Sequence, residues 1–174
     1  MFAERVVADY AITEGACLLI CKGDGELEQG LQQGLLEATN LKITALYPSK
    51  EAADQAEKKI RGAAHAGRIE YKVGSLAALP FAESSFDLIA GVGPVLIWEK
   101  DKAQAMREVY RVLRSGGAAL LGGEYRSMPD FRKVSSDSLR ESAAATGIPS
   151  IRVIDDMGQW VEVRKGIKDR GFCD

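Results

Sequence analysis

Apolar runs of strand length alternate with helical patterns along most of this chain, and no other feature of the sequence restricts the fold as much. The run Ala16–Cys21 is continuously apolar, as expected of a strand buried on both faces, and a helical pattern over Glu26–Ala38 follows it. The next pair repeats this order, with a strand over Lys42–Tyr47 and a helix over Lys50–Ala66 that Ser49 can cap. Repeated β-α units predict a parallel sheet with helices packed against it.

The second half of the chain continues this pattern and then departs from it. Two short runs near the end, Ser150–Asp155 and Gln159–Arg164, are joined by only three residues, and so short a connection indicates an antiparallel pair. Ser115-Gly116-Gly117 is expected to end a helix and to lead into the next strand. We therefore expect an α/β fold with a seven-stranded, mostly parallel, doubly wound sheet and a C-terminal antiparallel hairpin. The other predicted elements are strands over Arg68–Gly74, Phe86–Val92 and Ala118–Gly122, and helices over Lys102–Leu113 and Pro129–Thr146.

Length and charge limit the kind of protein this can be. The 174 residues suffice for one compact domain, predicted to span residues 1–174. The formal charge of -2 arises from 23 basic and 25 acidic residues mixed along the chain, so neither nucleic acid nor an anionic membrane is expected as a partner. Met1–Glu14 lacks the pattern of a secretory signal, and no apolar stretch approaches about 18 residues, which favours a cytoplasmic location. Cys17, Cys21 and Cys173 have no metal-binding spacing, so we expect reduced thiols and no metal site.

A glycine-rich turn follows the first predicted strand. Gly23-Asp24-Gly25 lies between a strand and a helix, where a loop without side chains lets the backbone approach a nucleotide closely. The third glycine of a dinucleotide fingerprint is replaced by Glu28, which disfavours a nicotinamide enzyme. His65, the only histidine, is expected at the end of the second helix, far from this turn, so a role as general base is not expected.

Three signatures in the middle of the chain resemble one enzyme family. Leu79-Pro80-Phe81, then Ser85–Ile89, then Glu108 with Arg111–Gly117 are similar in order and spacing to the "LPF", "SFDLV" and "E..RVLRPGG" signatures of class I S-adenosylmethionine-dependent methyltransferases. The resemblance is to the small-molecule methyltransferases that include the quinone-biosynthesis C-methyltransferases, and it covers about residues 11 to 165. It implies the sheet described above, S-adenosylmethionine as cofactor and a small-molecule methyl acceptor.

The resemblance also implies where the cofactor would bind, and this chain departs from the family there. Leu19 and Cys21 take the places of the family's acid and first glycine, Tyr47 that of the acid that binds the ribose, and Ser75 that of the acid that binds adenine. Lys22 could contact the methionine carboxylate or be a solvated loop residue. The cofactor-binding residues that the resemblance implies are Gly23, Asp24, Gly25, Tyr47, Ser75, Leu76 and Gly91; no catalytic residue can be assigned.

These observations leave more than one function open. The leading hypothesis is a methyltransferase that acts on a small molecule. The alternative is a methyltransferase-like domain that has lost its cofactor and serves as an interaction or regulatory module, with a protein partner or a homodimer. A third hypothesis is a crevice for another nucleotide or adenosyl compound. Trp98 is a candidate for an apolar substrate pocket or for core packing, and Glu124-Tyr125-Arg126 for substrate orientation or a surface loop.

Overall fold

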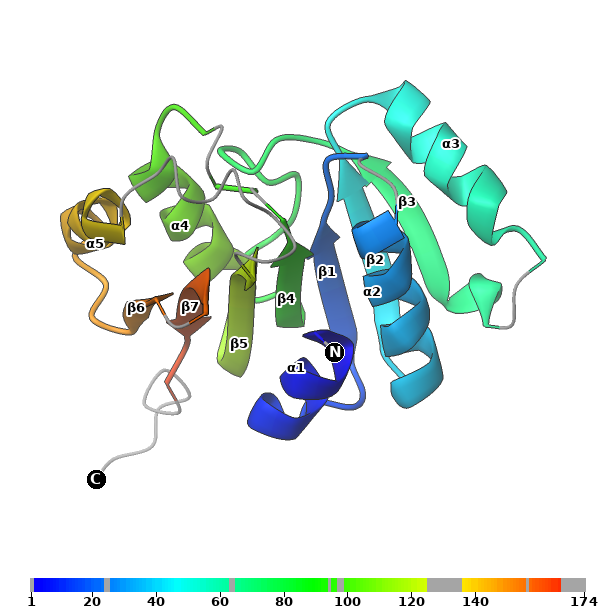
Figure 1. The fold of residues 1–174 in the computed structure, drawn as a ribbon, viewed down its shortest axis with the longest axis horizontal. Helices are drawn as coiled ribbons and strands as arrows, with labels where there is room; N and C mark the ends of the chain where they lie inside the picture. The colour runs from blue at the N-terminus through cyan, green and yellow to red at the C-terminus, as the bar shows by residue number, and fades with distance from the viewer. Residues whose placement is uncertain are drawn as a thin grey trace.

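The computed structural model describes residues 2–23, 26–62, 65–93, 95–96, 99–124, 136–155 and 157–166. Its strands are β1 (Ala16–Ile20), β2 (Lys42–Tyr47), β3 (Ile69–Val73), β4 (Phe86–Val92), β5 (Leu113–Glu124), β6 (Ile151–Asp155) and β7 (Gly158–Arg164). In this part of the chain they form a seven-stranded sheet in the order β3-β2-β1-β4-β5-β7-β6 (Figure 1). The strands from β3 to β5 are parallel neighbours, whereas β7 is antiparallel to both β5 and β6. The predicted fold class and the C-terminal hairpin are confirmed.

Helices cover both faces of this sheet. They are α1 (Phe2–Tyr10), α2 (Glu26–Ala38), α3 (Lys50–Ile60), α4 (Lys102–Val112) and α5 (Ser136–Ala145), and a 3-10 turn spans Ala66–Arg68. Helices α1, α2 and α3 pack on one face, and α4 and α5 pack on the other (Figure 1). Strand β1 shows why both faces must be covered. Its Cys17 and Leu19 pack in the core under α1, α2 and α3, whereas Leu18 and Ile20 pack in the core under α4 and α5.

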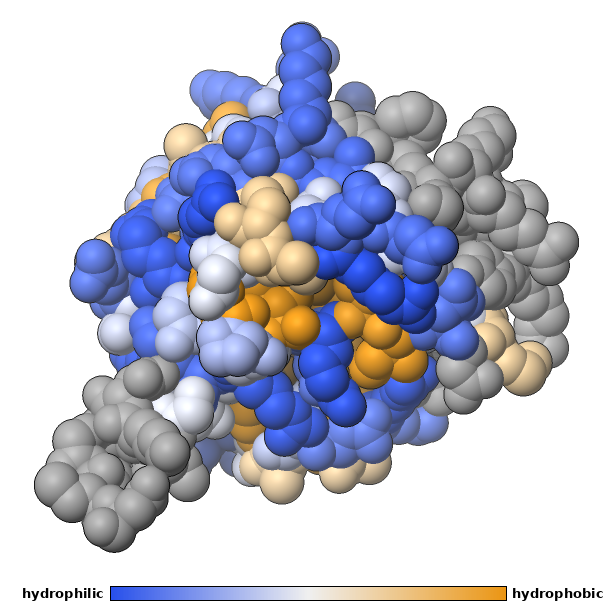
Figure 2. Space-filling model, turned by 90° about the vertical axis from the view of Figure 1, so that its left-hand side faces the viewer, coloured by the Kyte–Doolittle hydropathy of each residue, from blue (hydrophilic) through white to orange (hydrophobic). Residues whose placement is uncertain are grey.

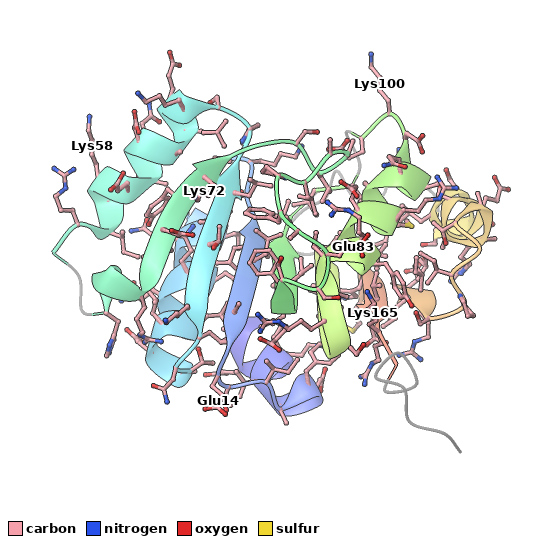
Figure 3. The ribbon with its side chains drawn as sticks, turned by 180° about the vertical axis from the view of Figure 1, so that it is seen from behind. Glu14, Lys58, Lys72, Glu83, Lys100 and Lys165 are labelled. Carbon is pink, nitrogen blue, oxygen red and sulfur yellow. The ribbon has the colours of Figure 1, made fainter. Side chains whose placement is uncertain are left out.

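On the α4 side, no described helix covers the part of the sheet formed by β2 and β3. Figure 3 shows this face, on which Lys72 of β3 lies in the open. Glu70 and Lys72 are exposed, and Thr44 Oγ1 lies 3.2 Å from Glu70 Oε1. Polar side chains can face water without a covering helix, so this end of the sheet is polar on one face.

The opposite end of the sheet carries partly exposed apolar side chains. Strand β6 forms this edge, and its residues Val153 and Ile154 are only partly buried against the two cores. Figure 2 looks onto this end and shows hydrophobic side chains exposed between hydrophilic ones.

A pair of charged residues on α4 holds the connection between β3 and β4. Glu108 Oε1 accepts a hydrogen bond of 2.9 Å from the Leu79 amide, and Arg111 donates to the Phe81 carbonyl (2.9 Å) and to the Leu79 carbonyl (3.1 Å). Arg111 also pairs with the Glu108 carboxylate at 2.6 Å, and this hydrogen bond holds the pKa of Glu108 below its ordinary value. The "LPF" and "E..RVLR" signatures are thus two halves of one structural contact.

The second predicted helix is shorter than expected. It ends at Ile60 rather than at Ala66, and Gly62 follows with φ +83°, a conformation that favours glycine and ends helices. His65 consequently lies outside the helix, with φ +66°, just before β3. The prediction of His65 at a helix C-terminus was wrong.

The turn predicted at Ser115-Gly116-Gly117 does not end α4. The helix stops at Val112, and β5 begins at the next residue, so the three residues lie inside the strand. The Gly116 amide donates to the Lys165 carbonyl at 2.8 Å, and the Lys165 amide donates to the Gly117 carbonyl at 3.1 Å. The pairing of β4 with β5 is interrupted between Leu113 and Ala118, and Gly116 has φ +85°, so the predicted turn is present as an irregularity inside β5 that also pairs with the chain beyond β7.

One helix was not predicted from the sequence. Helix α1 places Ala3 and Val6 in the core beside α2, and Tyr10 packs against the same core. The spacing of these residues by three and four is a helical signal. The other element ends lie within about two residues of the predicted ones, except at β5, which begins five residues before the predicted Ala118, and at α5, which begins at Ser136 after residues outside the described part of the chain.

Candidate functional site

Four of the predicted cofactor positions come together at one edge of the sheet. Tyr47 ends β2, Gly23 follows β1, Ser75 follows β3 and Gly91 lies near the end of β4. Because these four strands are parallel neighbours, their carboxyl ends lie side by side. Strand order reverses between β1 and β4, and in open α/β sheets ligands bind at such a reversal. Asp24, Gly25, Trp98, Tyr125 and Arg126 lie outside the described residues, as does the side chain of Glu124.

A buried carboxylate closes the glycine turn. Gly23 has φ +97°, and its amide donates to Glu28 Oε2 at 3.0 Å; the Lys22 amide donates to Glu28 Oε1. Glu28 is the third residue of α2 and is only 6% exposed. The sequence showed Glu28 only as a missing glycine, and its contact with the turn was not predicted. The capping-box pattern would place this acid on the amide three residues before it, whereas Glu28 bonds amides five and six residues before it, so no pattern in the sequence signals the contact.

Tyr47 is buried and held by contacts with its neighbours, although it lies at the end of β2. Its side chain is 2% exposed, its ring stacks on Tyr71 with centroids 6.0 Å apart, and its hydroxyl accepts a 2.8 Å hydrogen bond from Gln32 Nε2. Burial and the nearby Cys21 thiol raise the pKa of Tyr47, so the phenol stays protonated. Leu19 and Cys21 are buried in the same core under α2. These three substituted side chains fill the core on the α2 face.

The other predicted cofactor positions, Ser75, Leu76 and Gly91, differ in how much of each residue a ligand could reach. Ser75 is exposed, and its Oγ accepts a 3.2 Å hydrogen bond from the Ala77 amide. Leu76 is 5% exposed and packs in the α4-side core, so only its backbone is free to meet a ligand. At Gly91, an added Cβ would lie 3.0 Å from Leu121 Cδ2 and 3.3 Å from the Ile20 carbonyl oxygen. A side chain at this position would therefore force its packed neighbours to shift.

A small cavity lies beside the turn, between α2 and α3. It measures about 30 Å³, and Gly23, Glu28, Gln32, Tyr47 and Lys59 are among the residues that line it. This volume suits one or two water molecules and is far below that of a nucleoside. A nucleoside-sized ligand would therefore have to lie at the strand edge, outside this cavity.

A comparison with known families assigns the chain to one of them. The family profile described as "Methyltransferase domain" matches residues 25–121, more than half of the chain. This protein belongs to that methyltransferase family. With its sheet order, it is a member of the class I S-adenosylmethionine-dependent group, as the sequence resemblance implied.

Several relatives support this membership in the methyltransferase family. The chain is 30% identical over 110 residues to the ubiquinone/menaquinone biosynthesis C-methyltransferase UbiE of Geotalea daltonii. This match covers 62% of the chain and 44% of the relative. It is 36% identical over 103 residues to the malonyl-[acyl-carrier protein] O-methyltransferase of Erwinia billingiae, covering 59% and 34%. The matched part spans less than half the length of these curated relatives. A proposed S-adenosyl-L-methionine-dependent methyltransferase of Methanococcus maripaludis superposes with a TM-score of 0.79 and 30% identity, over 95% of this chain and 84% of that one.

Other features of this methyltransferase bear on what its site contains. His65 precedes β3 and so lies at the opposite edge of the sheet from Gly23. In the described ranges there is no cluster of three or more possible metal ligands, and Cys17 and Cys21 are buried free thiols. No described helix is long and apolar enough to cross a membrane.

Proposed function

We propose that this chain is an S-adenosylmethionine-dependent methyltransferase domain that acts on a small molecule. The observation that carries the proposal is the meeting of Gly23, Tyr47 and Ser75 at the strand edge where the sheet order reverses. Family membership supports the same activity, because the relatives named above are methyltransferases by description. The comparisons therefore do not favour the alternative of a cofactor-free interaction module.

The residues at this edge fit an adenosyl group in specific ways. Gly23 offers backbone without a side chain, and the exposed Ser75 hydroxyl can both donate and accept a hydrogen bond. The Tyr47 hydroxyl is already paired with Gln32, so backbone atoms and Ser75 must supply most polar contacts. The bound cofactor would supply an electrophilic methyl group. The protein's part is to hold an acceptor in line with it, which needs orientation more than a general base.

The acceptor is proposed only as a class. The descriptions of two relatives point to ubiquinone/menaquinone biosynthesis and to malonyl-[acyl-carrier protein], which supports a small molecule or a small carried group as acceptor. A cytoplasmic location, a single domain, a homodimer or protein partner, and the exclusion of nucleic acid and membranes stay predictions from the sequence.

Thermal unfolding of the purified protein with S-adenosylhomocysteine tests the proposal directly. A ligand at about 100 times its dissociation constant should add about 2.7 kcal/mol of apparent stability. We expect the melting temperature to rise with ligand concentration and to saturate. No shift at a millimolar concentration would refute cofactor binding and leave the interaction module as the better hypothesis.

The variant Gly23→Ala should separate binding from folding. Alanine at φ +97° is strained, and its Cβ would lie 3.2 Å from Ala52 Cβ, so the turn must shift. We expect the dissociation constant for S-adenosylhomocysteine, measured by calorimetry, to rise at least about tenfold.

Gly62→Ala is the matched control. Gly62 has φ +83° with no atom near its added Cβ, so the backbone strain is similar but lies away from the turn. This variant should lose about 1 kcal/mol of stability and bind the ligand like the wild type. If Gly23→Ala and Gly62→Ala bind S-adenosylhomocysteine equally well, the turn at Gly23 is not part of the binding site.

A further inference from the structure

Strand β6 is the last strand at its end of the sheet, and one side of its backbone faces outward. The Arg164 amide donates to the Ser150 carbonyl at 3.2 Å. Bonds between antiparallel strands alternate, so Arg152 also bonds to β7, whereas the amides and carbonyls of Ile151 and Val153 point away from β7. Within the described ranges, no strand pairs with this outer side. These backbone groups can therefore bond to a further strand.

The described strand carries none of the features that usually protect an edge. Natural edge strands are guarded by a proline, a bulge or a charged side chain that keeps other strands away. Strand β6 has no proline, and its register with β7 is regular over all five residues. Both of its charged side chains are engaged within the molecule, since Arg152 pairs with Glu162 of β7 at 2.7 Å and Asp155 accepts a hydrogen bond from Ser136 of α5.

Both faces of β6 carry apolar side chains that are only partly buried. Val153 packs against the core under α4 and α5, and Ile154 packs against the core under α1, α2 and α3. Hydrophobic side chains are exposed at this end of the molecule (Figure 2). A strand added beside β6 would place its own side chains next to these residues, and so extend both cores.

The sequence of β6 suits pairing with a second copy of the same strand. In an antiparallel pair with its twofold axis beside Val153, the two Val153 residues lie opposite each other, and Ile151 lies opposite Asp155 of the second copy. All five residues then pair, through the outward backbone groups of Ile151 and Val153. Val153 also lies opposite Val161 in β7. The valines at 153 and 161 of both copies would therefore form one apolar row across the joined sheets.

The charges of the strand favour this direction and this register. Antiparallel pairing places the basic end of one strand, at Arg152, beside the acidic end of the other, at Asp155, whereas parallel pairing would bring like charges together. An axis moved by one residue to Arg152 would set two arginines opposite each other. The register centred on Val153 avoids both conflicts.

We propose that two copies of this chain associate through β6 and join their sheets into one. The two β6 strands pair antiparallel around Val153. A pair of five-residue strands is small beside the interfaces of stable complexes, so the association is weak and depends on concentration. It does not depend on the proposed enzymatic activity.

Hydrogen exchange of the wild-type chain tests the pairing without any variant. The exchange rates of the Ile151 and Val153 amides are measured between about 10 µM and about 1 mM protein, a range that covers weak association. We expect both amides to exchange at least about tenfold more slowly at the highest concentration, because they become hydrogen-bonded between the copies. The Val73 amide is the internal control. It points outward from β3 at the other edge of the sheet, since the next amide, that of Gly74, donates to the Tyr47 carbonyl.

Rates of Ile151 and Val153 that do not change with concentration would overturn the proposal. Fast exchange throughout would mean a free edge, and slow exchange in a chain that sediments as a monomer would mean that another part of the chain covers β6. An equal slowing of Val73 would place the contact elsewhere.

The variant Val153→Pro tests the same pairing by sedimentation. Proline removes an amide that points away from β7, so the bonds between β6 and β7 are kept. We expect the wild type to approach the mass of two chains at about 1 mM and the variant to associate at least about tenfold more weakly. Val73→Pro is the matched control, because it removes an outward amide from the opposite edge, and it should associate like the wild type.

Circular dichroism shows whether each proline variant is folded, and the exchange experiment decides the question if Val153→Pro is not. A wild type that stays a single chain at about 1 mM would overturn the proposal. A folded Val153→Pro that associates as strongly as Val73→Pro would do the same.

Discussion

Replacing Gly122 with alanine should destabilise the protein by at least about 3 kcal/mol. Gly122 lies in β5 opposite Trp160 of β7, with φ +144°. A Cβ at this position would come within 2.0 Å of the Gln159 carbonyl oxygen and 2.9 Å of Trp160 Cα. Backbone atoms cannot rotate away as a side chain would, so the two strands must separate locally. Urea unfolding followed by circular dichroism measures the loss.

The matched control for this prediction is Gly147→Ala. Gly147 follows α5 with φ +72° and has no atom within 4 Å of its added Cβ, so it carries strain without a clash. Its loss should be about 1 kcal/mol. If both variants lose the same amount, the close approach of β5 and β7 is not what requires glycine at position 122.

Replacing Glu162 with glutamine should cost about 2 kcal/mol at neutral pH. This carboxylate is 5% exposed and accepts hydrogen bonds from the Tyr10 hydroxyl (2.6 Å) and from Arg152 (2.7 Å), with Arg164 at 3.4 Å. Burial alone would raise the pKa of Glu162, but the hydrogen bonds from Tyr10 and Arg152 and the charges of Arg164 and Arg152 hold it below its ordinary value. The contact ties α1 to β7.

The sign of this pKa shift fixes the pH dependence. A carboxyl with a lowered pKa in the folded state stabilises the fold above its ordinary pKa of 4.5, and this contribution is lost as the pH falls through the lowered value. The difference in unfolding free energy between wild type and Glu162→Gln should therefore be constant near neutral pH and shrink on acidification below about pH 4.5. The exposed Glu141→Gln should change stability by less than about 0.5 kcal/mol at every pH. A gap that does not vary with pH would contradict the prediction.

Most of the fold was predictable because its signals are local. The strand over Phe86–Val92 and the helix over Glu26–Ala38 were found with their observed bounds, since a buried apolar run and a helical period each appear in a short window. The antiparallel hairpin was predicted because three residues cannot carry a crossover. Family signatures such as Glu108 with Arg111 were also visible, although their contact with the Leu79 backbone could not be.

The errors arose where distant parts of the chain decide local structure. Ser115-Gly116-Gly117 was predicted to end α4, but it forms an irregular turn inside β5, held by pairing with Lys165. At the candidate site, the sequence identified the strand ends that meet, yet the partner of Tyr47 and the placement of Glu28 against the Gly23 amide depend on side-chain geometry. The site residues themselves remain predictions until binding is measured.

The bond between Tyr10 and Glu162 joins residues that are 152 positions apart in the sequence. Arg164 also lies over the Tyr10 ring at 4.8 Å, and Arg5 lies over the Trp160 ring at 5.1 Å. During synthesis on the ribosome, α1 emerges first but must wait for β7 before these contacts can form. A nascent chain halted before β7 could therefore pack α1 against α2 but would leave it undocked on the β7 side.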